Sequence, residues 1–147
     1  MLNEFSRSEL LLGEDKVSLL KNKRVAVFGV GGVGGYVVEG LARTGVGSLD
    51  LIDNDTVSLT NINRQIIALH STIGKDKVEV MRDRVLDINP NCKVNIHKTF
   101  YLPETAGEFD FREYDYIVDA IDTVAGKLML IEEAKRCGTP IICSLGA

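Results

Sequence analysis

The sequence predicts an α/β fold in which a mainly parallel sheet carries helices on both faces, as in Rossmann-like, doubly wound domains. Short, almost continuously apolar segments alternate with longer segments of helical periodicity. A glycine-rich turn joins the first such strand to the helix that follows it. The 147 residues, 45% of them hydrophobic, are enough for one domain with its own core.

The N-terminal segment 1–22 is expected to be helical, because leucine and valine positions recur on both sides of a break at Gly13. A nucleotide-binding domain is expected over 23–147. It begins with residues 24–28, which are apolar enough for a strand buried on both faces. Valines at helical spacing then continue to a stop at Gly45, and a second strand is expected over the next apolar run, 49–52.

The same alternation continues to the end of the sequence. Residues 56–68 are polar and are expected to form a loop with a short helical turn, and 102–112 a short helix with a loop. Helical periodicity predicts helices over 75–88 and 125–137. Further strands are expected over 93–97, 116–120 and 140–144. The residues expected to face inward from the last helix are Leu128, Ile131 and Ala134.

Composition and charge indicate which broad classes of protein the sequence does not fit. A net charge of −4 and a pI of about 5.2 give no overall attraction to nucleic acid. No apolar run is long enough to span a membrane and no signal peptide is evident, so a cytoplasmic protein is expected. Cys92, Cys137 and Cys143 form no CxxC pair and are expected to be simple thiols. Because the sequence stops directly after the last expected strand, we expect a further C-terminal part.

The glycine-rich turn predicts a nucleotide site. Gly29, Gly31 and Gly34 form a GxGxxG pattern between a strand and a helix, and Gly32 lies inside it. Glycine permits the tight turn, lets backbone N–H groups approach a phosphate and lets helix and strand pack closely. Asp53, at the end of the second strand, is placed to meet a ribose hydroxyl. The turn alone does not choose between NAD, FAD and ATP.

The polar residues beyond the second strand favour ATP. Arginine holds phosphate with paired donors, which suits Arg64, and Lys77 would add a point charge. Asp122 follows the fourth expected strand, where a carboxylate can hold Mg²⁺ beside a triphosphate. The other candidate nucleotide-binding residues of this region are Asp55, Asn61 and Gln65.

Simpler roles remain open for these residues. Asn61 can be a cap or turn residue, and Arg64 can be a solvated charge. Lys77 can pair with nearby acids. Asp119 is expected to cap the end of its strand rather than to bind metal, and Arg7 by itself reads as a solvated residue.

Several motifs together resemble the adenylating domain of the ubiquitin-activating-enzyme-like superfamily, over nearly the whole chain: GVGGVG, LIDNDTV, TNINRQ, GKDKVEVMRDRVLDINP and DAIDT. Within it, LARTGVG, TNINRQIIAL, KVEVM and YIVDAID are most similar to the tRNA threonylcarbamoyladenosine dehydratase branch. This resemblance implies ATP-dependent adenylation of a substrate carboxylate. The expected reaction is cyclisation of the threonylcarbamoyl group on adenosine 37 of tRNA.

The resemblance also implies residue roles. Gly32 and Asp53 would hold the nucleotide, and Asp122 would hold Mg²⁺. Arg7 would reach the ATP site of a neighbouring subunit, which implies a homodimer. The residues expected to contact the phosphates are Asn61, Arg64 and Lys77. Two alternatives stay open: adenylation of the C-terminal glycine of a ubiquitin-like sulfur-carrier protein, and an NAD-dependent oxidoreductase or a non-catalytic nucleotide-binding module.

Overall fold

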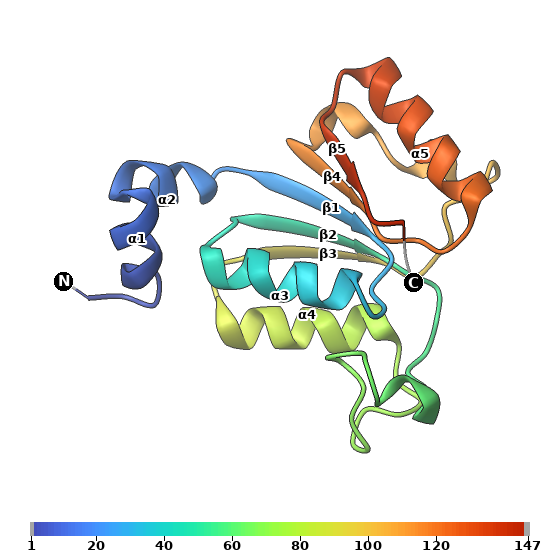
Figure 1. Cartoon of the computed structure of the whole chain (residues 1–147), viewed down its shortest axis with the longest axis horizontal. Coiled ribbons are helices and arrows are strands. Elements are labelled where there is room, and N and C mark those ends of the chain that lie inside the picture. Colours follow the sequence, from blue (N-terminus) through green and yellow to red (C-terminus); the bar gives the residue numbers. More distant parts are fainter. Residues whose placement is uncertain (1, 146–147) are drawn as a thin grey trace.

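Five short strands pair as one parallel sheet in the computed structural model, which describes residues 2–145 (Figure 1). The strands are β1 (Arg24–Phe28), β2 (Ser48–Ile52), β3 (Lys93–His97), β4 (Tyr116–Asp119) and β5 (Ile141–Cys143). Their order across the sheet is β3-β2-β1-β4-β5, and every neighbouring pair is parallel. The predicted doubly wound fold class is therefore confirmed. Because the strand order reverses between β1 and β4, their carboxyl ends border the crevice where such folds bind ligands.

Helices cover both faces of this sheet. Figure 1 shows α3 (Gly34–Thr44) and α4 (Lys77–Ile88) on one face and α5 (Val124–Cys137) on the other. The end of α3 at Gly45 is confirmed, since this glycine has φ 97°, in the left-handed region. Three short 3₁₀ turns lie at Leu59–Asn61, Ala106–Glu108 and Phe111–Glu113.

Each face of the sheet has its own core. On the face covered by α3 and α4, Val27 and Leu51 pack with Val78, Met81 and other aliphatic residues. On the other face the core is aromatic, and the ring of Phe28 lies 5.3–5.7 Å, between centroids, from its three aromatic neighbours. These neighbours are Tyr101, Phe109 and Phe111. Residues 102–112, expected to form a short helix with a loop, thus supply two aromatic residues of the second core, Phe109 and Phe111.

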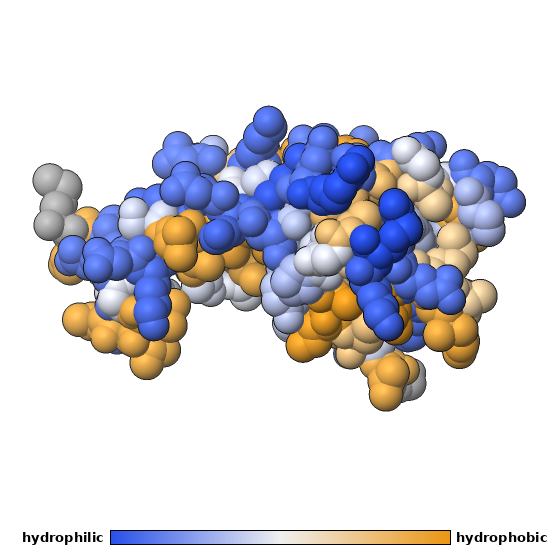
Figure 2. All heavy atoms as spheres, turned by 90° about the horizontal axis from the view of Figure 1, so that it is seen from above, coloured by the Kyte–Doolittle hydropathy of each residue, from blue (hydrophilic) through white to orange (hydrophobic). Residues whose placement is uncertain are grey.

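The N-terminal segment forms α1 (Ser6–Leu12) and α2 (Glu14–Leu20), which lie beyond the amino ends of the strands (Figure 1). The expected pair of short helices that meet near Gly13 is confirmed. The segment is anchored by Phe5, whose ring lies against Gly45, and by Val17, which is fully buried. Leu10 and Leu11 are more than four-fifths exposed, and Figure 2 shows apolar side chains gathered on this part of the molecule.

The prediction for the inward face of α5 is wrong for two of its three residues. Leu128 is 55% exposed and Ile131 is 39% exposed, whereas Ala134 is buried as expected. The buried stripe instead runs through Lys127, Leu130 and Ala134. The rotation follows from Lys127, because its ammonium group bonds the buried carboxylate of Asp119 and therefore turns that side of the helix inward.

A polar network lies within the sheet. Asp50, in the middle of β2, has no exposed surface. Arg24 donates to both of its carboxylate oxygens, at 2.8 and 2.9 Å, and His97 and Asn95 approach the same carboxylate at 3.1 and 3.2 Å. Burial acts to raise the pKa of Asp50, but these hydrogen bonds lower it from 3.8 to about 2.

Replacing Asp50 with asparagine is expected to destabilise the fold by about 2 kcal/mol near neutral pH. A carboxyl whose pKa is lower in the folded protein stabilises the fold above its unfolded pKa, and this stabilisation is lost as the pH falls from about 4 towards 2. Urea unfolding across that pH range should show the loss in the wild type and not in Asp50→Asn. Asp83→Asn, at an exposed carboxylate on α4, is the control. An equal acid slope in Asp50→Asn would contradict the assignment.

Candidate nucleotide-binding site

The glycine turn between β1 and α3 is built so tightly that side chains cannot enter it. Gly29 has φ 94°, and a Cβ there would lie 2.6 Å from the backbone oxygen of Ala120. A Cβ on Gly34 would lie 1.7 Å from the backbone oxygen of Gly29. The requirement for glycine at these two positions is therefore steric, as the GxGxxG pattern predicts.

Backbone amides of this turn are available to a ligand. Among residues 2–145, the N–H groups from Gly31 to Gly34 have no hydrogen-bond acceptor, whereas the N–H of Gly35 closes the first turn of α3 onto Gly31 at 3.0 Å. Four free N–H groups at the positive end of an 11-residue helix make an anion site. A phosphate is the group of a nucleotide that this turn fits.

Asp53 holds the shape of the turn. Its two carboxylate oxygens accept the N–H groups of Val30 and Asp55, each at 2.8 Å. Each oxygen keeps a further lone pair, so a ribose hydroxyl can still donate to this carboxylate. The ribose role of Asp53 stays a prediction, and its bond to the turn is a second role that the sequence did not indicate.

Arg64 lies over the turn, as a phosphate ligand would. Its Cγ is 3.7 Å from the position that a Cβ on Gly32 would take. One guanidinium nitrogen, Nη1, donates to the backbone oxygen of Thr60 and to Oδ1 of Asn63, at 3.0 and 3.1 Å. These bonds orient the exposed guanidinium and leave Nε and Nη2 as donors for an anion.

Asn61 has the simpler role that the sequence left open. Its Oδ1 accepts the N–H of Ser58 at 2.9 Å, in a capping box around the 3₁₀ turn. The side chain is nearly buried, and its Nδ2 group remains as a donor. A phosphate contact through Nδ2 stays a prediction beside this structural role.

Gln65 is the most informative polar side chain of the site. It is 7% exposed, and its Oε1 is buried without a hydrogen-bond partner among the described residues. Its Nε2 lies 3.5 Å from the position that a Cβ on Gly31 would take. An unpaired buried amide oxygen costs about 1–3 kcal/mol, so a ligand that bonds this amide would relieve the cost.

Lys77, the first residue of α4, lies near an acid, which is the simpler role that the sequence left open, and its contact with phosphate stays a prediction. It is 5% exposed, and its Nζ lies 3.8 Å from Oδ2 of Asp55. The pairing with a nearby acid is therefore present, but at a distance too long for a good hydrogen bond. The backbone N–H of Lys77 also donates to the backbone oxygen of Asp55, at 3.1 Å, which holds α4 against this side of the site.

Two carboxylates, Asp119 and Asp122, lie at the end of β4 and in the loop that follows it. Asp119 is fully buried, and its Oδ1 accepts the N–H of Ile121 at 3.1 Å, so its role at the strand end is confirmed. Asp122 is exposed. No cluster of three potential metal ligands occurs among residues 2–145. A single free carboxylate fits Mg²⁺ that arrives on a triphosphate, because Mg²⁺ takes one or two carboxylates, phosphate oxygens and water.

Arg7 is the one predicted site residue that its own fold keeps away. It lies on α1, beyond the amino ends of the strands, whereas the glycine turn lies at their carboxyl ends (Figure 1). The other predicted residues lie in the turn, in the segments that follow β2 and β4, or, for Lys77, at the start of α4. A contact between Arg7 and a nucleotide therefore requires the turn of a second subunit.

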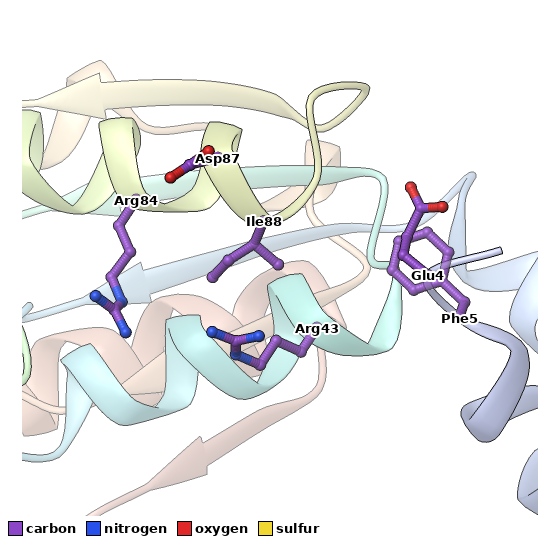
Figure 3. A pocket seen from close by; sticks show the side chains of 6 residues that line it. All are labelled: Glu4, Phe5, Arg43, Arg84, Asp87 and Ile88. Atoms are coloured by element: carbon purple, nitrogen blue, oxygen red, sulfur yellow. The ribbon is translucent and has the colours of Figure 1, made fainter.

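A hollow in the surface lies away from this site. It measures about 360 Å³ and lies at the last turns of α3 and α4 (Figure 3). Its two arginines, Arg43 and Arg84, both pair with Glu39, and Glu4 and Asp87 add negative charge. A helix carboxyl end repels phosphate, so this hollow does not fit the nucleotide.

The cysteines show no sign of nucleophilic activation. All three are free, and burial raises the pKa of the Cys92 thiol to about 11. Burial also raises the pKa of Cys143. These thiols are therefore uncharged at neutral pH, as expected for simple thiols rather than nucleophiles.

The chain is similar to known proteins over most of its length. The chain is 48% identical over 147 residues to the tRNA threonylcarbamoyladenosine dehydratase of Bacillus subtilis, covering 100% of this chain and 58% of that protein. It is 35% identical to a probable adenylyltransferase/sulfurtransferase, MoeZ, of Mycobacterium tuberculosis, covering 89% of this chain and 33% of that protein.

The chain is also similar to a solved structure. The crystal structure of the Escherichia coli tRNA N6-threonylcarbamoyladenosine dehydratase in complex with ATP superimposes with a TM-score of 0.92 at 40% identity, covering 95% of this chain and 58% of that one. The chain thus spans little more than half the length of the dehydratases it matches. Since residues 5–147 also match the ThiF family, the chain belongs to the ThiF family.

Proposed function

We propose that this chain is the ATP-binding part of an enzyme that adenylates a carboxylate on tRNA, as a threonylcarbamoyladenosine dehydratase. The observation that carries the proposal is the turn from Gly31 to Gly34, which offers free amides beneath the exposed guanidinium of Arg64. Backbone amides and a guanidinium together can stabilise the negative charge that develops on a reacting phosphate. The dehydratase of Bacillus subtilis, which matches the whole length of this chain, supports tRNA as the substrate.

In the proposed reaction, the substrate carboxylate attacks the α-phosphate of ATP, which gives an acyl-adenylate and pyrophosphate. Arg64 and Lys77 stabilise the charge that develops on the phosphates. An internal nucleophile of the threonylcarbamoyl group then attacks the activated carbonyl and AMP leaves, so that water is lost overall. Mg²⁺, carried with ATP to Asp122, would supply further charge stabilisation. No protein nucleophile is needed, which agrees with the inactive cysteines.

We further propose that the enzyme works as a homodimer in the cytoplasm. Arg7 lies on α1, beyond the amino ends of the strands, whereas the glycine turn lies at their carboxyl ends, so a partner subunit would have to receive it. The exposed Leu10 and Leu11 on the same helix support a contact there. Among residues 2–145, no helix is long and apolar enough to cross a membrane.

The decisive experiment is exchange of labelled pyrophosphate into ATP. The protein, at the length at which the cell makes it, should exchange label when tRNA carrying threonylcarbamoyladenosine is present. Exchange with the C-terminal tail of a sulfur-carrier protein, and none with the tRNA, would move the function to the alternative that the MoeZ relative represents.

ATP with Mg²⁺ is expected to bind and NAD is not, because Arg64, Lys77 and Asp122 serve a triphosphate and have no role in holding a nicotinamide. Calorimetric titration of this chain with each nucleotide measures the difference. ADP-ribose, which has the adenosine and the diphosphate without the nicotinamide, is the matched control. Tight NAD binding with none of ATP would indicate the oxidoreductase class instead.

A further inference from the structure

A buried ion pair lies behind the loop that carries Asp122. Asp119 is fully buried and Lys127 is 8% exposed. The Nζ atom of Lys127 is 3.3 Å from each carboxylate oxygen of Asp119, and it also donates to the backbone oxygen of Ser144. Removing two charges from water carries a penalty that apolar residues of similar volume would avoid. We therefore looked for a role of the Asp119–Lys127 pair other than packing.

The pair ties together the two ends of one short loop. Asp119 is the last residue of β4, and Lys127 lies in the first turn of α5. Within the loop, the N–H of Ile121 donates to Oδ1 of Asp119 at 3.1 Å, and Thr123 caps α5 by accepting the N–H of Gly126 at 3.3 Å. The loop is thus held at both ends and braced from inside.

This loop also forms one wall of the glycine turn. The N–H of Ala120 donates to the backbone oxygen of Phe28 at 2.8 Å. The Cβ of Ala120 is 3.3 Å from the position that a Cβ on Gly34 would take. Asp122 follows two residues later and is exposed. How the loop ends are held therefore determines where the Asp122 carboxylate stands relative to the phosphate-binding amides.

We propose that Asp119 and Lys127 are positioning residues that fix Asp122 against the glycine turn, so that its carboxylate meets the metal carried by the triphosphate. The inference rests on the proposed function, in which ATP is consumed. Directional, charge-assisted hydrogen bonds suit this task, because they fix the geometry of a loop more precisely than apolar contact does. Lys127 itself does not reach for the nucleotide, since its ammonium group is already bonded by three oxygens.

The test compares Lys127→Arg, Lys127→Met and the double variant Asp119→Asn/Lys127→Met. The single Met variant leaves a buried carboxylate unpaired and should melt well below the wild type. The double variant removes both charges at similar volume and should melt close to it. Its kcat for ATP consumption should nevertheless fall about 10- to 100-fold. Its Kd for AMP without divalent cation should stay within about threefold, because the turn itself is intact. Lys127→Arg should recover part of kcat.

Amide hydrogen exchange gives a readout that does not depend on turnover. Exchange across residues 120–126 should accelerate in the double variant and stay slow in the wild type. The matched control is Glu39→Gln/Arg84→Met, which removes an ion pair between α3 and α4 outside the site. This control should leave both kcat and exchange in the loop unchanged.

Wild-type kcat in the folded double variant, with unchanged exchange in the loop, would reduce the pair to a packing element and overturn the inference. If the wild type does not consume ATP at all, the proposed function fails instead. Amide hydrogen exchange and AMP binding then still decide whether the Asp119–Lys127 pair holds the loop. Amide exchange of the loop at the wild-type rate in the double variant would overturn that role.

Discussion

Replacing Gly34 with alanine is expected to abolish nucleotide binding and to destabilise the fold by at least about 3 kcal/mol. The new Cβ would lie 1.7 Å from the backbone oxygen of Gly29. Because that oxygen belongs to the backbone, no rotamer change can relieve the clash, and the turn has to open. Opening moves the free amides from Gly31 onwards away from the phosphate. Calorimetric titration with ATP and urea unfolding measure the two effects.

Alanine substitutions at two further glycines distinguish loss of nucleotide binding from loss of stability. Gly40→Ala lies on the same helix in open space, and it should leave binding unchanged and stabilise the fold by up to about 1 kcal/mol. Gly47→Ala would bring a Cβ to 1.8 Å from the backbone oxygen of Lys21, far from the turn. It should therefore destabilise the fold while the folded fraction still binds ATP. Normal ATP affinity in Gly34→Ala would contradict the role of the turn.

The sheet was predictable because its signals are local. β1 is almost continuously apolar and mostly buried, β3 alternates apolar and polar residues at the edge of the sheet, and both lie at the residues that the sequence predicts. The remaining strands differ from their predictions only at their ends. The glycine turn was predictable for the same reason, since each glycine meets backbone atoms within the unit that the motif defines.

Buried polar residues were not predictable, because their partners are distant in sequence. Asp50 reads as an ordinary polar position, and only the sheet brings Arg24 and His97 to it. Lys127 reads as a surface residue of α5, and its pairing with Asp119 rotates the helix and exposes Leu128. A pattern method places apolar residues inward by default, so it fails wherever an ion pair determines which side of a helix is buried.

In the candidate site, too, local features were predictable and contacts between distant residues were not. Arg64 was identified by its residue type and by a specific motif, but its position over Gly32 depends on the path of residues 53–64 around the turn. The unpaired Oε1 of Gln65 has no signal in the sequence, because the sequence does not show which glutamine side chains are buried. Residue type indicates what chemistry is available, and the fold decides which groups remain unsatisfied and so open to a ligand.

Replacing Arg64 with alanine is expected to lower kcat/KM for ATP consumption by about 100- to 1,000-fold, as removal of a donor to developing charge does. The fold should lose less than about 0.5 kcal/mol, since the side chain is exposed and its bonds are to nearby residues. Arg64→Lys keeps the charge and loses the planar pair of donors, so it should recover only part of the rate. Initial rates of pyrophosphate release, with urea unfolding in parallel, make the comparison.

Arg82→Ala is the matched control, because Arg82 also lies on the surface and also pairs with a residue next to it in sequence, Asp83. It should change neither the rate nor the stability appreciably, so any general effect of losing a surface guanidinium is accounted for. If Arg64→Ala and Arg82→Ala consume ATP equally well, Arg64 is a solvated charge that happens to lie over the turn. The free amides of Gly31–Gly34 would then have to hold the phosphates without it, and the case for an ATP that reacts would depend on Lys77 and Asp122.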